Sequence, residues 1–230
     1  MENRISVTIS GGIADVKLDR PEKMNALDQA MFDALVDTGE RLKSEAALRA
    51  VVLSGAGRAF CAGLDMGRFQ AMAQAGANAD PRAANAERLG KRTHGDANRS
   101  QHAVLVWRQI PVPVIAAVHG VALGGGFQVA LGADIRFVAP DARMSILEIK
   151  WGLVPDMGGT VLMRRLARAD VIRELTFSGR MFSGTEALAY GFATRVSERP
   201  YEDAMAYARE VAGKSPHTIR AAKRLLKLAE

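Results

Sequence analysis

The sequence has 230 residues, of which 48% are hydrophobic and 24% charged, a composition ordinary for a globular protein with a sizeable buried core. Its net charge of +6 favours anionic partners or a solvated basic surface. Zinc-finger spacing, an RNP-type aromatic signature and long Lys/Arg runs are all absent from the sequence, so nucleic acid is not an expected partner. The single cysteine, Cys61, excludes an intramolecular disulfide, and the four histidines show no metal-ligand spacing, so no metal is expected.

Two stretches bear on membranes and location. The opening residues, MENRISVTI, alternate in polarity and lack the long apolar run of a signal peptide, so we expect a cytoplasmic protein. The segment 110–132 carries no Asp, Glu, Lys or Arg, but its prolines and glycines divide it into strand, turn and helix. We therefore interpret it as buried core, and no membrane is expected as a partner.

The N-terminal half predicts a hairpin, a helix and a strand. Residues 5–9 and 13–18 alternate in polarity on either side of a Gly-Gly pair, which is typical of a hairpin. Apolar residues recur at helical spacing from Asp28 to Leu42, with Asp28 as the expected N-cap. Residues 50–55 form a short apolar strand. Residues 68–102 turn to Ala, Asn, Asp, Arg and Gln, which favours a mobile lid or surface excursion over core.

The C-terminal half alternates strands and helices, which favours the α/β class. The expected elements are a strand in 112–120, a helix from the glycine run to about residue 133, a strand at 135–139, helical stretches at 159–179 and 184–197, and an amphipathic helix at 215–230. The last helix carries a basic face that we expect to be solvated, formed by Arg220, Lys223, Arg224 and Lys227.

The first candidate catalytic feature of the sequence is a pair of segments with free backbone N–H groups. The glycine run is neither a P-loop nor a dinucleotide-binding motif, and the sequence has no G-x-S-x-G elbow. Two junctions remain, at 59–67 and 124–126, where free N–H groups at a loop and a helix start could form an oxyanion hole. Two carboxylates follow, Glu148 and Asp156. An oxyanion hole with an acid/base but no nucleophile favours enolate chemistry.

Five motifs in order carry a family resemblance: RPEKMNALD, AFCAGLDM, HGVALGGGFQVALGADIRF, EIKWGLVPDMGGT and SPHTIRAAKRLL. They resemble the crotonase superfamily, the enoyl-CoA hydratase/isomerase family. The resemblance implies a spiral of repeated strand-strand-helix units over 1–193, with 68–102 as a variable excursion. A helical segment follows over 194–230, without the final tail usual in the family. It also implies a homotrimer or dimer of trimers that binds acyl-CoA thioesters, with coenzyme A on the substrate and no resident cofactor.

The resemblance also assigns residues. It places the two oxyanion amides on Leu64 and Gly125, and the glycine run would let a thioester oxygen reach Gly125 unobstructed by a Cβ. It places coenzyme A against the loop after residue 61, with a cation near its phosphates. The residues assigned to substrate and coenzyme A are Lys23, Ala62, Asp65, Met66 and Gly124.

Gln128 departs from the hydratase pattern. Hydratases of the family use two glutamates; the second falls on Glu148 and the first on Gln128, whose amide orients a water or ligand but cannot accept and return a proton. Asp156 has the spacing of the acid/base partner in the dienoyl-CoA isomerase branch, although it could equally be a helix N-cap. Glu148, in turn, could be a loop carboxylate paired with Lys150 or an arginine.

We therefore expect double-bond isomerisation, with Glu148 as base, Asp156 or Glu148 returning the proton and Gln128 orienting substrate or water. Burial by neighbours such as Leu153 and Val154 would raise the pKa of Glu148. The alternatives are a hydratase that uses Glu148 and a water positioned by Gln128, or a non-catalytic protein on the same scaffold that binds CoA thioesters or RNA.

Overall fold

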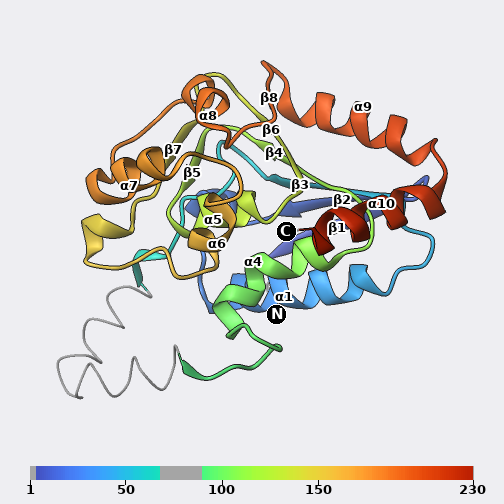
Figure 1. Cartoon of the computed structure of the whole chain (residues 1–230), viewed down its shortest axis with the longest axis horizontal. Coiled ribbons are helices and arrows are strands. Elements are labelled where there is room, and N and C mark those ends of the chain that lie inside the picture. Colours follow the sequence, from blue (N-terminus) through green and yellow to red (C-terminus); the bar gives the residue numbers. More distant parts are fainter. Residues whose placement is uncertain (1–3, 68–89, 230) are drawn as a thin grey trace.

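A six-stranded sheet forms the centre of the molecule (Figure 1), seen in a computed structural model that describes residues 4–67 and 90–229. The strand order is β1-β2-β3-β4-β6-β8; β1 and β2 pair antiparallel and the other neighbours pair parallel. The strands are β1 (Ile5–Ser10), β2 (Ile13–Leu18), β3 (Ala50–Gly55), β4 (Val114–Val118), β6 (Ile135–Val138) and β8 (Arg195–Val196). A second, two-stranded parallel sheet pairs β5 (Val121–Leu123) with β7 (Arg143–Ser145).

The central strands β3 and β4 are almost entirely apolar because both faces of the sheet are covered. All five residues of β4 are buried. Alternate residues of β3 and β4 face α9 (Pro200–Ala212), where Val52 and Ile115 pack with Ala204. The residues between them face the main core, where α1 (Gln29–Lys43), α4 (Arg99–Gln109) and α5 (Gly125–Leu131) lie. Segment 110–132 is thus core, as expected, and none of the described helices has the length and apolarity to cross a bilayer.

The predicted hairpin, first helix and strands 50–55, 112–120 and 135–139 are confirmed. The carboxylate of Asp28 caps α1 by accepting the Met31 N–H at 2.8 Å, because the first-turn amides of a helix have no intrahelical partner. The mixed α/β class is confirmed too.

The surface excursion predicted for 68–102 is wrong at its C-terminal end. Residues 68–89 lie outside the described residues, but Arg99 already begins α4, and His102 is 3% exposed. Asn98 and Gln101 close a reciprocal capping box at the start of this helix. The polar composition reflects that cap and an amphipathic first turn, which packs against α1.

The C-terminal elements also differ from the expectation. Residues 159–179 form two helices, α6 (Gly159–Met163) and α7 (Ala169–Ser178), and residues 184–197 form α8 (Gly184–Tyr190) followed by β8. The division after residue 193 stays a prediction, but β8 and α9, which lie beyond it, both pack on the main sheet.

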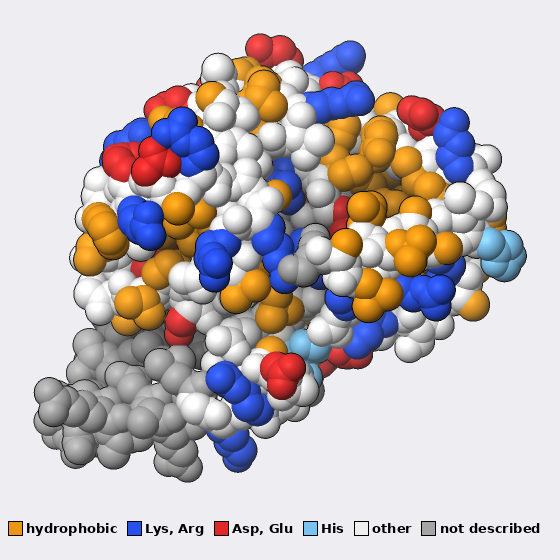
Figure 2. Space-filling model, in the orientation of Figure 1, with side chains coloured by type: hydrophobic (Ala, Val, Ile, Leu, Met, Phe, Trp, Pro, Cys, Tyr) orange, Lys and Arg blue, Asp and Glu red, His pale blue; other side chains and the backbone are white. Residues whose placement is uncertain are grey.

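The last helix is α10 (Pro216–Leu228), and part of the basic face that we expect to be solvated is instead in contact with the protein. Arg220 donates to the Leu48 carbonyl oxygen, and Lys223 donates to the Val112 carbonyl oxygen and pairs with Asp134 at 2.5 Å. These two cations are therefore anchors rather than a solvated face. The leucines of α10 point outward instead, and Figure 2 shows hydrophobic side chains gathered on this part of the surface.

Candidate active site

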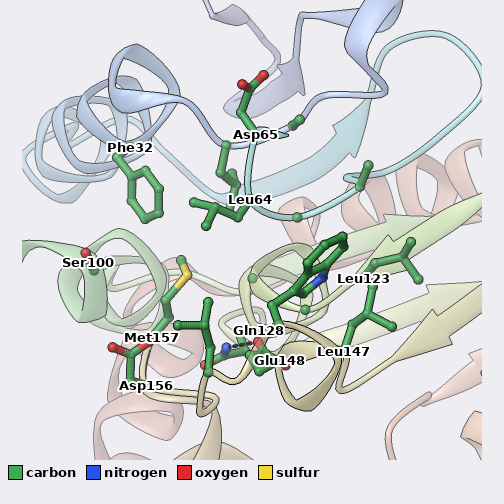
Figure 3. Close-up of a pocket in the computed structure, with 18 of the residues that line it drawn as sticks. Phe32, Leu64, Asp65, Ser100, Leu123, Gln128, Leu147, Glu148, Asp156 and Met157 are labelled. Carbon is green, nitrogen blue, oxygen red and sulfur yellow. Dashed lines mark hydrogen bonds between the residues drawn. The ribbon is translucent and has the colours of Figure 1, made fainter. Parts of the chain in front are cut away.

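A cavity of about 1140 Å³ brings together all ten residues that the sequence analysis singled out. They come from the first short 3-10 helix η1 (Pro21–Lys23), the 61–67 loop, the start of α5 and the segment from 148 to 157. These residues are Lys23, Ala62, Leu64, Asp65, Met66, Gly124, Gly125, Gln128, Glu148 and Asp156. Figure 3 shows Leu64 on one side of the cavity and Gln128, Glu148 and Asp156 on the other.

Two residues that line this cavity, Leu64 and Gly125, have backbone amides without a backbone acceptor among the described residues. Leu27 donates to the Gly63 carbonyl oxygen at 2.7 Å and accepts from the Asp65 N–H at 3.2 Å, so the Leu64 N–H between them points away from Leu27. Gly125 is the first residue of α5, where N–H groups have no intrahelical partner. Within 4–67 and 90–229, neither amide donates to a backbone oxygen. Both can therefore donate to a ligand oxygen.

The glycine run is required by packing as well as by access. A Cβ on Gly126 would lie 2.4 Å from the Cys61 carbonyl oxygen, and a Cβ on Gly125 would lie 2.9 Å from side-chain atoms of both Leu27 and Met157. Gly124 has φ +49°, a conformation that disfavours a side chain. The three glycines thus let the start of α5 sit directly against the 61–65 loop.

Glu148 begins the second 3-10 helix, η2 (Glu148–Trp151), and is 8% exposed. Its Oε1 accepts a hydrogen bond from Gln128 Nε2 at 2.7 Å, drawn as a dashed line in Figure 3. Its Oε2 is buried and has no hydrogen-bond partner among the described residues. Burial raises the pKa of Glu148, the Gln128 amide opposes that shift, and the charge of Asp156 adds to it. The expected direction of the shift is confirmed, and the ion pair with Lys150 or an arginine, which we had kept as an alternative, is wrong for the described residues.

Gln128 holds Glu148 through a fixed network. Its side chain is 1% exposed, and its Oε1 accepts the Gly159 N–H at 2.9 Å. A Cβ on Gly159 would lie 2.5 Å from the same oxygen, so only glycine lets the backbone come this close. The contacts of Gln128 thus orient Glu148, and its expected role of orienting substrate or water stays a prediction.

Asp156 is half-buried and lines the cavity. The helix N-cap that we had kept as an alternative is wrong, because α6 is capped by Gly158. Its effect on the pKa of Glu148 shows that the two carboxylates interact electrostatically. The site therefore holds two interacting carboxylates, one of them oriented by an amide.

The residues assigned to coenzyme A differ in solvent exposure and in their polar contacts. Lys23 is exposed at the end of η1, and Met66 is 51% exposed. The Asp65 carboxylate pairs with Arg20 at 2.6 Å and accepts the Gly67 N–H, and Figure 3 shows it directed away from Glu148. Asp65 therefore stabilises the conformation of its own loop through these two contacts. No local pattern predicts that Arg20 contact, because the two residues lie 45 positions apart.

Comparison with known proteins shows the family of this chain. The profile of the enoyl-CoA hydratase/isomerase family matches residues 8–229. The chain is 33% identical over 215 residues to the mitochondrial Delta(3,5)-Delta(2,4)-dienoyl-CoA isomerase of Mus musculus, covering 92% of this chain but only 64% of that protein. It is 30% identical to the (E)-benzylidenesuccinyl-CoA hydratase of Thauera aromatica, covering 95% of this chain and 80% of that one. An enoyl-CoA hydratase/isomerase structure from Mycobacterium paratuberculosis superposes with a TM-score of 0.86 at 28% identity, covering all of this chain and 86% of the other.

Proposed function

Because this chain belongs to the enoyl-CoA hydratase/isomerase family, the crotonase superfamily, we propose that it shifts a carbon–carbon double bond in an unsaturated acyl-CoA thioester. The observation that carries the proposal is the pairing of Glu148 with an amide. Gln128 donates to Glu148 Oε1 and leaves Oε2 as the only unbonded oxygen of a buried carboxylate. Such a site can remove a proton, but among the described residues no second carboxylate is hydrogen-bonded to Glu148 to hold and activate a water with it.

The reaction begins with the thioester carbonyl oxygen between the Leu64 and Gly125 N–H groups. Glu148 Oε2 takes the proton from the carbon beside the carbonyl, and the electron pair of that C–H bond moves onto the oxygen as an enolate. The two amides stabilise this negative charge because they are already oriented toward it. A raised pKa suits Glu148 to the task, since the base must hold the proton long enough to return it.

The proton returns at the far end of the conjugated system. In a 3-enoyl thioester that carbon is C4, and Glu148 can deliver the same proton there. In a 3,5-dienoyl thioester it is C6, and we assign the delivery to Asp156, which lines the same cavity. For the dienoyl substrate Asp156 starts protonated and ends as a carboxylate. The proton that Glu148 took from the substrate then passes to Asp156, directly or through water, so that each turnover leaves the protein unchanged.

Turnover of 2-enoyl, 3-enoyl and 3,5-dienoyl thioesters, with product masses, tests the proposal. We expect unchanged mass with a shifted double bond. A gain of one water from the 2-enoyl substrate, without isomerisation of the others, would instead establish the hydratase. Tight binding with no product from any substrate would establish a binding protein.

Asp156→Asn tests the second carboxylate, because a carboxamide cannot deliver the proton. Its rate on the 3,5-dienoyl thioester should fall by about 10²–10⁴, while its rate on the 3-enoyl thioester stays within a few-fold of the wild type. Equal losses on both substrates would contradict a distinct role for Asp156.

Location and assembly complete the proposal. The buried, unpaired Cys61 supports the reducing cytoplasm, and the family resemblance supports a homotrimer or dimer of trimers. Size-exclusion chromatography with light scattering would test the assembly directly.

A further inference from the structure

The mouth of the active-site cavity is lined by exposed apolar side chains. Three large hydrophobic residues that line the cavity are also well exposed: Met66 at 51%, Trp151 at 43% and Val154 at 67%. We call these three residues the apolar mouth. Met66 lies two residues after Leu64, whereas Trp151 and Val154 follow Glu148, so the apolar mouth spans both walls of the site.

Trp151 and Glu148 belong to the same short helix, η2. They are the last and first residues of η2, and residues three apart on a 3-10 helix project from the same side. Both line the cavity, with Glu148 buried and Trp151 partly exposed. Trp151 therefore lies on the same wall of the cavity as Glu148 and nearer to solvent.

We propose that Trp151 is a specificity-determining residue, whose indole covers the thioester and the first carbons of an apolar acyl chain and closes the apolar mouth over them. The inference rests on the proposed function and adds the acyl class: a chain that is apolar next to the thioester. A charged group placed beside the indole and the Met66 side chain would lose hydration that these two apolar side chains cannot replace, which disfavours it.

The two tryptophans make the contact measurable. Trp107 is fully buried and donates its indole N–H to the Ala103 carbonyl oxygen, so it reports on the core. A change of emission on ligand binding should therefore come from Trp151. The probes are free coenzyme A and butyryl-CoA, a saturated thioester that has no double bond to shift.

We expect butyryl-CoA to shift and change the emission of the wild type, free coenzyme A to give a much smaller change, and Trp151→Phe to abolish the response. Trp151→Ala should bind butyryl-CoA about tenfold more weakly, equivalent to about 1.4 kcal/mol. Its affinity for free coenzyme A should stay within twofold of the wild type. The matched control is Leu188→Ala, which truncates a similarly exposed residue outside the cavity and should change neither.

Equilibrium dialysis with both probes separates the two proposals. Butyryl-CoA that binds to the wild type without changing its emission, and equally well to Trp151→Ala, would overturn the inference about Trp151 alone. Failure of any CoA thioester to bind would overturn this inference and the proposed function together. A loss of affinity shared equally by coenzyme A and butyryl-CoA would place Trp151 against the coenzyme instead of the acyl chain and would also overturn the inference.

Discussion

Replacing Gln128 by methionine tests the network that orients the proposed base. Methionine has a similar length but neither donates to Glu148 nor provides a good acceptor for Gly159. The variant therefore breaks the 2.7 Å bond to Glu148 Oε1 and the 2.9 Å bond from the Gly159 N–H, and it leaves both partners buried. Catalysis and stability should both respond, for separate reasons.

The magnitude follows from these two bonds. A hydrogen bond to a charged group contributes about 1.5–3 kcal/mol, and an orphaned buried N–H costs about 1–3 kcal/mol. The free energy of unfolding should thus fall by about 3–5 kcal/mol, a large part of the roughly 5–15 kcal/mol typical of folded domains. Urea denaturation should show a lower midpoint with an unchanged slope.

Activity should change in a second way. The Gln128 amide opposes the rise in the pKa of Glu148, so its loss should move the acid limb of the rate–pH profile to higher pH and reduce kcat about 10–100-fold. Gln128→Glu is the control, because it keeps an acceptor for Gly159. Its carboxyl and Glu148 must share a proton, so its stability should fall only as pH rises. If the free energy of unfolding of Gln128→Met fell by less than about 1 kcal/mol and its rate–pH profile matched the wild type, Gln128 would not orient Glu148 as described.

Three further variants test other parts of the structure. In Glu148→Gln we expect a rate loss of about 10²–10⁴. Burial raises the folded-state pKa of Glu148 above its value in the unfolded chain, so its contribution to stability falls as pH rises from about 4.5 through the raised pKa. The Tm of this variant should therefore increase relative to the wild type between pH 4 and pH 8, and a constant difference would contradict it. Gly126→Ala places a Cβ 2.4 Å from the Cys61 carbonyl oxygen and should cost about 1–3 kcal/mol in urea denaturation, whereas Gly90→Ala, where a Cβ meets nothing within 4 Å, should be neutral. Lys223→Met leaves Asp134 without its ion-pair partner and should lower the free energy of unfolding by about 2–3 kcal/mol. Tryptic cleavage before α10 should also become faster. Unchanged proteolysis would show that Lys223 does not anchor this helix.

Local sequence patterns predict correctly those elements whose apolar spacing, caps and turn signals lie within one segment. The α1 helix follows from its apolar spacing and the Asp28 cap, and β3 and β4 follow from short apolar runs between turn signals. The same patterns failed for α4, where the capping box and the buried His102 lie in a stretch of polar composition. Its helical face becomes apparent only when α1 is placed beside it.

The family, the fold class and the candidate residues of the site can be predicted from the chain alone, because glycines at a helix start, a lone cysteine and ordered motifs are properties of the sequence. The contacts that those residues make with one another depend on how distant segments pack. Gln128 and Gly159 are 31 positions apart, yet they meet within hydrogen-bond distance and together hold Glu148. Burial, which raises the pKa of Glu148 and makes it suited to proton transfer, is likewise produced by several elements packing together, and no single segment encodes it.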